Sequence, residues 1–324
     1  MSDATATAER GGDNEVAHDF SPLLVVYRSG RLERPLILPL VTTGCDDATG
    51  VVSKDVPVSP SSFVRLYLPA GEKLVKLPVV VYFHGGGFVI GSAATCVYHR
   101  CLNDLATACP AVAVSVDYRL APEHLLPAAY EDSLAALKWV LSASDPWLAA
   151  HGDLARVFLA GDSAGGNICH HLAMHPDMRD AGLRGIVLIH PWFWGKEPIS
   201  GEQEHRRSAG RAEGRQGKKG LWEFVCPDAA DGVDDPRMNP MATGAPELEN
   251  LACEKVMVCV AEGDHLRWRG KAYAEAAARA KKGPEPAVEL FESEGVGHVF
   301  YLLDPTMEKA KELLGRIAAF VDAE

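Results

Sequence analysis

Short runs of apolar residues recur along the chain and predict its architecture. Most of the runs are continuous rather than alternating, which is typical of strands buried on both faces. We expect eight strands of this kind, at residues 23–27, 63–68, 79–83, 112–116, 157–160, 186–189, 256–260 and 288–291.

Segments with apolar residues at helical spacing separate these runs from residue 79 onward. They lie at residues 98–108, 127–141, 166–174, 271–281 and 306–321. Alternation of strands and helices predicts an α/β fold, with a mostly parallel central sheet flanked by helices on both faces. The first two apolar runs precede this alternation with no clear helix between them, so we expect them to form an antiparallel edge.

The ends and loops of the chain suggest one folded domain. Residues 1–18 are mostly small and polar and lack apolar periodicity, so we expect a disordered tail followed by a single domain at 19–324. No internal repeat or coiled-coil heptad is evident. The stretch 202–220 is rich in glycine and charge, which indicates a long surface insertion.

Composition and charge narrow the classes of partner and compartment. The chain has 324 residues, is 47% hydrophobic and carries a formal charge of −12, which disfavours nucleic acid and anionic lipid as partners. No run of about 18 apolar residues predicts a membrane span. Its 8 cysteines show no C-x-x-C pair and suggest thiols in a reducing compartment. We therefore expect a protein of the cytoplasm or the nucleus, either monomeric or homodimeric.

The most informative pattern is Gly-Asp-Ser-Ala-Gly at residues 161–165, between a predicted strand and a predicted helix. A serine on so tight a turn needs neighbours without a Cβ, because the backbone is strained and closely packed there. An ordinary glycine-rich turn is the alternative for the motif alone. In this context the pattern makes Ser163 the candidate nucleophile.

A second glycine run strengthens this interpretation. His-Gly-Gly-Gly at residues 84–87 follows a predicted strand, where backbone amides can stabilise a developing oxyanion. We expect the amides of Gly85, Gly86 and Ala164 to form that oxyanion hole. His84 is expected to orient or pack rather than to act as a base.

An activated serine requires a base and an acid that orients it, in the chain order serine, acid, histidine. Of the 12 histidines, His298 lies on a glycine-rich loop after a predicted strand, in the right order. Asp264 follows the strand at 256–260 and is the expected acid, with Glu262 as the reserve candidate. No cluster of His, Cys and carboxylate residues shows metal spacing, so no metal or other cofactor is expected.

Four motifs together resemble the plant carboxylesterases of the hormone-sensitive-lipase group. They are His-Gly-Gly-Gly-Phe at 84–88, Asp-Tyr-Arg-Leu-Ala-Pro-Glu at 117–123, Gly-Asp-Ser-Ala-Gly-Gly-Asn at 161–167 and Glu-Gly-Val-Gly-His at 294–298. The resemblance covers nearly the whole chain from residue 20. It implies the α/β-hydrolase fold, the triad of Ser163, Asp264 and His298, and the oxyanion hole named above. It also implies a lid over the pocket, which we place at about 19–45 and 193–225.

The expected reaction is hydrolysis of a small hydrophobic carboxylic ester through an acyl-enzyme. Ser163 attacks the carbonyl, His298 carries the proton and Asp264 stabilises the imidazolium. The candidate residues for the walls of a substrate pocket are Phe88, Trp192, Trp194 and Phe300.

Two departures from the family pattern affect the expected pocket and substrate more than the triad. Relatives commonly carry Leu-Arg-Asp-Arg after the acid, where this chain has Leu-Arg-Trp-Arg at 266–269, and the stretch 202–220 is unusually charged.

The resemblance also supplies two alternative functions. Gibberellin receptors share the fold and the serine but replace the histidine with an aliphatic residue, whereas this chain keeps His298. Hydroxyisoflavanone dehydratases use a similar site for elimination of water. The sequence favours an enzyme over a receptor but does not separate hydrolysis from elimination.

Overall fold

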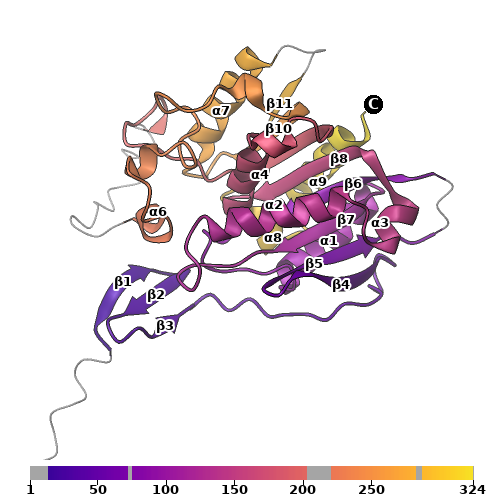
Figure 1. Cartoon of the computed structure of the whole chain (residues 1–324), viewed down its shortest axis with the longest axis horizontal. Coiled ribbons are helices and arrows are strands. Elements are labelled where there is room, and N and C mark those ends of the chain that lie inside the picture. Colours follow the sequence, from indigo (N-terminus) through magenta and orange to yellow (C-terminus); the bar gives the residue numbers. More distant parts are fainter. Residues whose placement is uncertain (1–13, 72–74, 203–219, 282–286, 324) are drawn as a thin grey trace, which may run out of the picture.

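An eight-stranded sheet runs through the centre of the computed structural model, which describes residues 14–71, 75–202, 220–281 and 287–323 (Figure 1). The strand order is β11-β10-β9-β8-β6-β7-β5-β4. The six strands from β11 to β7 in this order are all parallel to one another. At the other edge, β5 pairs antiparallel with β7, and β4 pairs antiparallel with β5. The strands are β4 (Val52–Ser59), β5 (Ser62–Leu68), β6 (Leu77–Phe83), β7 (Val112–Asp117), β8 (Gly152–Asp162), β9 (Leu183–Ile189), β10 (Cys253–Ala261) and β11 (Val288–Ser293).

Helices cover both faces of this sheet. One face carries α1 (Cys96–Ala108), α8 (Phe300–Leu303) and α9 (Glu308–Asp322). The other face carries α2 (Ala128–Leu141), α3 (Pro146–His151), α4 (Ala164–Ala173) and α7 (Arg267–Ala280). Single 3-10 turns lie at Pro176–Met178, Gly232–Asp234 and Leu248–Asn250. The predicted α/β fold with a mostly parallel sheet is therefore confirmed.

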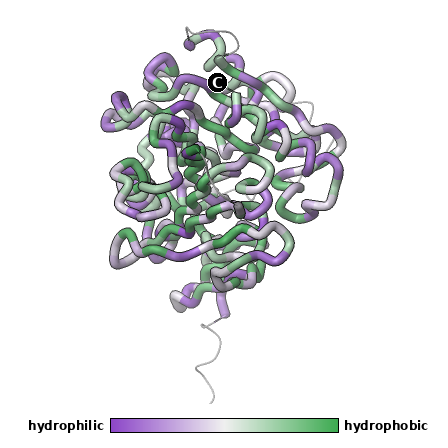
Figure 2. Tube along the Cα trace, turned by 90° about the vertical axis from the view of Figure 1, so that its right-hand side faces the viewer, coloured by the Kyte–Doolittle hydropathy of each residue, from purple (hydrophilic) through white to green (hydrophobic). Residues whose placement is uncertain are grey.

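The sheet has an apolar core on each of its faces, which explains why the sequences of the central strands are continuously apolar. Along β6, Val79 and Val81 face the core beneath α2 and α4, whereas Val80 and Tyr82 face the core beneath α1 and α9. Both faces of the strand are thus buried and neither can be polar. Figure 2 shows the same organisation, with hydrophobic chain concentrated in the interior and hydrophilic chain toward the periphery.

The N-terminal region differs from the sequence expectation. The run predicted at 23–27 is β2 (Leu24–Tyr27), which pairs with β1 (Val16–Phe20) and β3 (Leu32–Glu33) in a separate sheet instead of joining the main sheet's edge. The start of β1 also lies inside the predicted tail 1–18, of which residues 1–13 fall outside the described residues.

One buried carboxylate joins four elements of the core. Asp162, at the end of β8, accepts hydrogen bonds from the Tyr82 hydroxyl at 2.9 Å, the Tyr98 hydroxyl at 3.0 Å and the Gly85 amide at 3.0 Å. The hydroxyls of Tyr82 and Tyr301 lie 3.0 Å apart, which extends the network to α8. Burial raises the pKa of Asp162 to about 6, although these hydrogen bonds oppose the shift.

The structure predicts that a methyl group at position 165 disrupts the core. A Cβ on Gly165 would lie 1.9 Å from the carbonyl oxygen of Phe83, and this oxygen belongs to strand backbone that cannot move aside. We expect Gly165→Ala to lower the free energy of unfolding by about 3 kcal/mol or to prevent folding. Thermal and urea denaturation measure the effect.

Gly315 provides the matched control for this substitution. It is exposed on α9, and a Cβ there meets nothing within 4 Å. Gly315→Ala is expected to raise the free energy of unfolding by about 0.5 to 1 kcal/mol, since alanine favours helix. Equal effects of the two substitutions would contradict the predicted close contact at Gly165.

A second prediction concerns the pH dependence of stability. The folded state holds the Asp162 proton up to about pH 6, whereas an unfolded aspartate releases it near its ordinary pKa of 3.8. Ionisation of this group therefore opposes folding as the pH rises. In Asp162→Asn this contribution disappears. We expect the stability of the variant relative to wild type to rise by roughly 2 to 3 kcal/mol between pH 4 and 7. Parallel stability curves, measured in urea at each pH, would refute this assignment.

Candidate active site

A cavity of about 400 Å³ opens where β6, β8 and β10 end. Ser163, His298 and the glycine run Gly85 to Gly87 form part of its wall. The remaining wall is mostly aliphatic, and its residues include Leu23, Leu36, Leu38, Ile90, Val97, Leu221, Leu266, Val299, Leu302 and Leu303. Five residues of this wall are expected site residues from the sequence, namely Ser163, His298, Trp192, Gly85 and Gly86.

Ser163 occupies a strained turn between β8 and α4. Its φ is 52° and its ψ is −114°, a backbone conformation that residues with a Cβ rarely adopt. The backbone around it is held from several directions, because Ser163 donates its amide to Ile189 at 2.9 Å and its carbonyl accepts from Trp192 at 2.9 Å. Such strain persists where the surroundings over-determine the conformation, and it clusters at functional sites.

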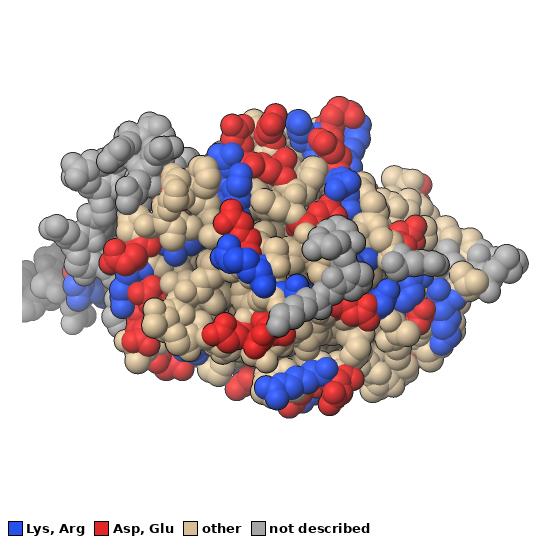
Figure 3. Space-filling model, turned by 90° about the horizontal axis from the view of Figure 1, so that it is seen from above, with Lys and Arg blue, Asp and Glu red and all other residues tan. Residues whose placement is uncertain are grey.

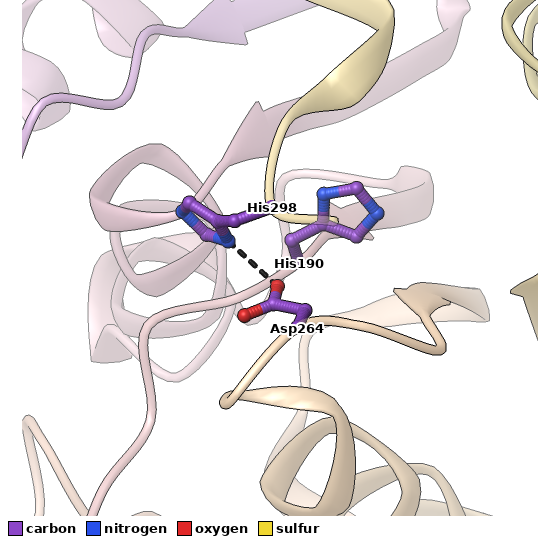
Figure 4. A group of neighbouring side chains, drawn as sticks. All are labelled: His190, Asp264 and His298. Atoms are coloured by element: carbon purple, nitrogen blue, oxygen red, sulfur yellow. Dashed lines mark hydrogen bonds and ion pairs between the residues drawn. The ribbon is translucent and has the colours of Figure 1, made fainter. Parts of the chain in front are cut away.

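His298 and Asp264 form a short hydrogen bond beside the cavity. Nδ1 of His298 lies 2.6 Å from Oδ2 of Asp264 (Figure 4). The other carboxylate oxygen of Asp264 accepts the Leu266 amide at 2.9 Å. Burial alone would raise the pKa of Asp264, but the hydrogen bond and charge of His298, together with the Leu266 amide, hold it below its usual range. Asp264 is therefore an ionised partner that orients the imidazole.

The reserve acid, Glu262, occupies a different place. Its side chain is exposed and accepts the amide of Gly295 at 2.9 Å, at the start of the loop that carries His298. Glu262 thus fastens the histidine loop, while Asp264 contacts the histidine itself.

His190 is a neighbour of the pair that the sequence analysis missed. It follows β9 directly, and its ring centroid lies 5.7 Å from that of His298. Its Nδ1 accepts the amide of Val299 at 3.0 Å. Val299 has a φ of 48°, an unfavourable value for a β-branched residue, so this bond supports a strained backbone next to His298. Burial, aided by the His298 charge, lowers the pKa of His190 to about 3, which keeps the ring neutral and able to accept.

The cluster of His190, Asp264 and His298 has donor atoms close enough together to suggest a metal site. Their present bonds argue against that use. Asp264 and His298 bind each other directly, and Nδ1 of His190 accepts a backbone amide. All three side chains are thus engaged in holding the histidine loop.

The structure corrects one of the three expected oxyanion donors. The amide of Gly85 points into the core, where it donates to the Tyr98 hydroxyl at 2.8 Å and to Asp162 at 3.0 Å. It is therefore not free to bind a substrate oxygen. Within the described part of the chain the amides of Gly86 and Gly87 have no hydrogen-bond acceptor, and Ala164 is the first residue of α4, where helix amides lack partners. Gly87 is a donor candidate that the sequence analysis missed.

Three of the four aromatic residues expected in the pocket lie elsewhere. Phe88 is 1% exposed and packs against Tyr118, Tyr130 and Trp192, so it belongs to the core. Phe300 is also buried, beside His190 and Tyr301. Trp194 lines a neighbouring cavity, and only Trp192 of the four reaches the wall that contains Ser163. The apolar character of a residue does not by itself predict whether its ring faces a cavity or the core.

The N-terminal segment lies over the cavity and is fastened to the core. Arg34 forms a two-pronged ion pair with Glu123 and donates to the carbonyls of Val89 and Ala121. Phe20 of β1 packs 5.0 Å from Phe224 of α6 (Leu221–Val225). The two regions expected to form the lid thus touch each other, although residues 203–219 of the second region lie outside the described residues.

The tryptophan that departs from the family pattern packs outside this cavity. The ring of Trp268 covers Gly201, where a Cβ would lie 2.2 Å from it. The next residue, Arg269, is 3% exposed and forms a two-pronged ion pair with Glu202, which is also 3% exposed. These contacts fix the start of the charged stretch onto α7.

The model of the alpha/beta hydrolase fold family matches residues 80–302. Among curated relatives, the probable carboxylesterase 13 of Arabidopsis thaliana is 41% identical over 96% of this chain and 99% of its own length. The 2-hydroxyisoflavanone dehydratase of Glycyrrhiza echinata is also 41% identical, over 99% of this chain and 100% of its own length.

Solved structures of esterases share the same architecture. The hyperthermophilic esterase of Pyrobaculum calidifontis superposes with a TM-score of 0.67 at 32% identity, covering 84% of each chain. A thermostable carboxylesterase from a metagenomic library gives a TM-score of 0.66 at 28% identity, covering 88% of this chain and 90% of that one. The chain belongs to the α/β-hydrolase fold family and, within it, to the group of enzymes that includes the plant carboxylesterases.

Proposed function

We propose that this enzyme hydrolyses small hydrophobic carboxylic esters through an acyl-enzyme formed on Ser163. The observation that carries the proposal is the 2.6 Å hydrogen bond between Asp264 and His298 beside the cavity that also contains Ser163. A histidine held in this way by an ionised carboxylate is suited to act as a general base toward a serine hydroxyl.

The proposed reaction has two proton transfers through His298. Ser163 attacks the ester carbonyl while His298 takes its proton, and Asp264 stabilises the resulting imidazolium. When the tetrahedral intermediate collapses, His298 returns the proton to the departing alcohol. A water molecule, activated by the same imidazole, then releases the acid and restores Ser163.

The tetrahedral oxyanion would bind to the amides of Gly86, Gly87 and Ala164. Gly86 has a φ of 106° and Gly87 a φ of 62°, conformations that suit glycine and set the direction of their amides. The buried bonds of Gly85 to Tyr98 and Asp162 anchor this loop at its base. A loop held before the substrate arrives requires no reorganisation during the reaction.

The shape and lining of the cavity support a hydrophobic substrate. Leu23, Leu36 and Leu38 of the N-terminal segment close one side of it with aliphatic surface. We propose that residues of about 19–45 and 193–225 act together as the lid over this cavity. A volume near 400 Å³ is within the range of small-ligand sites.

We expect the enzyme to act in a reducing compartment, the cytoplasm or the nucleus. All eight cysteines are free thiols, and most are buried. No helix in the described ranges has the length and apolar character needed to cross a bilayer. On the face seen in Figure 3 acidic and basic side chains are intermixed, which offers no extended basic surface for nucleic acid.

The dehydratase relative supports elimination of water as a second candidate reaction. Its identity to this chain equals that of the carboxylesterase, so similarity alone favours neither reaction. Incubation with a 2-hydroxyisoflavanone separates them, because elimination yields a product lighter by one water. A gibberellin-type receptor is disfavoured by His298, since a binding site that does no chemistry has no need of a histidine held by an ionised aspartate.

The central test is hydrolysis of p-nitrophenyl acetate and butyrate by single variants. We expect Ser163→Ala, His298→Ala and Asp264→Asn each to lower kcat by about 10³-fold or more. Each removes one member of a proposed triad whose three side chains act together. A p-nitrophenyl phosphonate should label wild type once, on Ser163, as read by mass spectrometry.

The control is Ser61→Ala, which removes an exposed hydroxyl in the turn between β4 and β5. Its turnover should equal that of wild type. Full activity in Ser163→Ala, or phosphonate label on another residue, would overturn the proposed mechanism.

A further inference from the structure

A second cavity of about 410 Å³ adjoins the proposed catalytic cavity. Trp192, Leu221 and His265 belong to the walls of both, so the two spaces meet at these side chains. The residues that line only the second cavity are Trp194, Gly195, Lys196, Gly220, Trp222, Glu223, Val233 and Met238.

The chemistry of this second cavity differs from that of the aliphatic one beside it. Trp192 and Trp194, which are half-buried, offer ring surface to its wall, whereas Trp222, which also belongs to the wall, is only 2% exposed and backs Trp192. The rings of Trp192 and Trp222 stand nearly perpendicular at 88°, with centroids 6.3 Å apart. Trp222 is fixed in place by its indole nitrogen, which donates to the Gly232 carbonyl at 2.9 Å. The electron-rich faces of indoles attract cations more strongly than other aromatic rings do.

Among the described residues around the cavity, one carboxylate has no ion-pair partner. Nζ of Lys196 lies 3.8 Å from Oδ2 of Asp234, so its charge is matched. Arg269, which lies against the ring of Trp194, is matched by Glu202. Glu223, in contrast, has no ion-pair partner in the described part of the chain, although it belongs to the cavity wall. As far as the described residues go, the cavity therefore combines aromatic surface with one unmatched negative charge.

His265 indicates which half of a substrate would reach this second cavity. Its ring centroid lies 6.1 Å from that of His298, and it follows Asp264 directly in the chain. In the proposed reaction His298 delivers a proton to the departing alcohol, so the alcohol oxygen must lie beside His298. A group that extends past His265 therefore belongs to the alcohol half of the ester.

We propose that this cavity is a subsite for a cationic alcohol group, of the quaternary ammonium type, on the ester substrate. Indole faces and a carboxylate are the combination that recognises such cations in proteins. The net charge of −12 further favours the approach of cationic over anionic substrates. This inference rests on the proposed function, because it assigns the alcohol half of the same substrate.

The kinetic test compares two esters of equal shape. Butyrylcholine carries the cation, and 3,3-dimethylbutyl butyrate replaces its nitrogen with carbon. We expect wild type to prefer butyrylcholine by about tenfold in kcat/KM, mainly through KM, because only the cation gains from the indoles and the carboxylate. Equal values for the two esters, or a preference for the neutral one, would refute the subsite.

Variants of Glu223 separate its charge from a structural role. Glu223→Gln should reduce the preference for butyrylcholine by about three- to tenfold, whereas Glu223→Asp should retain most of it because the charge remains. Glu249→Gln, an equal loss of charge at an exposed position away from the cavity, should leave the preference unchanged. A preference that is the same in Glu223→Gln as in wild type would contradict the assignment.

A binding measurement tests the subsite independently of hydrolysis. Hexyltrimethylammonium should quench the tryptophan fluorescence of Ser163→Ala saturably, and more weakly when Glu223→Gln is added. Turnover of p-nitrophenyl butyrate without any such binding would reject the subsite and leave the proposed function standing. Saturable binding without turnover of any ester would retain the subsite as a cation site and reject the esterase mechanism.

Discussion

The close approach of β6 to the turn that carries Ser163 is the constraint on which the site depends. A Cβ on Gly161 would lie 2.7 Å from the Phe83 carbonyl oxygen, and one on Gly165 would lie 1.9 Å from it. Only glycine at both positions allows the end of β6 to touch the start of α4. This contact places the loop of Gly86 and Gly87 beside Ser163, because that loop leaves the sheet immediately after Phe83. Two motifs separated by more than 70 residues in sequence thereby form one wall of the cavity.

The same edge of the sheet brings the histidine and its acid to this wall. β8, β9, β10 and β11 are consecutive parallel neighbours, so their carboxyl ends lie side by side. Ser163, His190, Asp264 and His298 follow these four strands in turn. A polar residue placed after any of them reaches the same region, and this arrangement requires long-range order that only the packed sheet supplies.

Most of the fold was predictable because buried parallel strands have a distinct apolar signature. The elements that were not predicted correctly are those whose place in the fold depends on the strands with which they pair. β4 is mostly exposed or half-buried and contains Pro57, as an edge strand does, so it lacks the continuous apolar run of the central strands. β2 has an apolar run like the others, but its pairing with the half-buried β1 removes it from the main sheet.

Within the proposed site, the sequence pointed to Ser163, His298 and Asp264, which the structure brings to one edge of the sheet, because their order and motifs are strong constraints. It could not indicate the direction of the Gly85 amide, which depends on a carboxylate 77 residues later in the chain. It also passed over His190, although a histidine directly after a buried strand was a usable signal. Phe88 was assigned to the pocket because its ring is apolar, yet its positive φ of 63° accompanies a buried side chain.

The second of the two proposed lid segments is anchored separately from the first, and each borders one of the two adjoining cavities. The buried ion pair of Arg269 with Glu202 and the contact of Trp268 with Gly201 fix that segment to α7, close to Asp264. Breaking a buried ion pair is costly, so the start of the segment is held rigidly. The aliphatic cavity, in contrast, is closed by the N-terminal segment and its Arg34 contacts. The two halves of an ester would therefore be recognised by two independently anchored parts of the chain, which allows one half of the specificity to change while the other is kept.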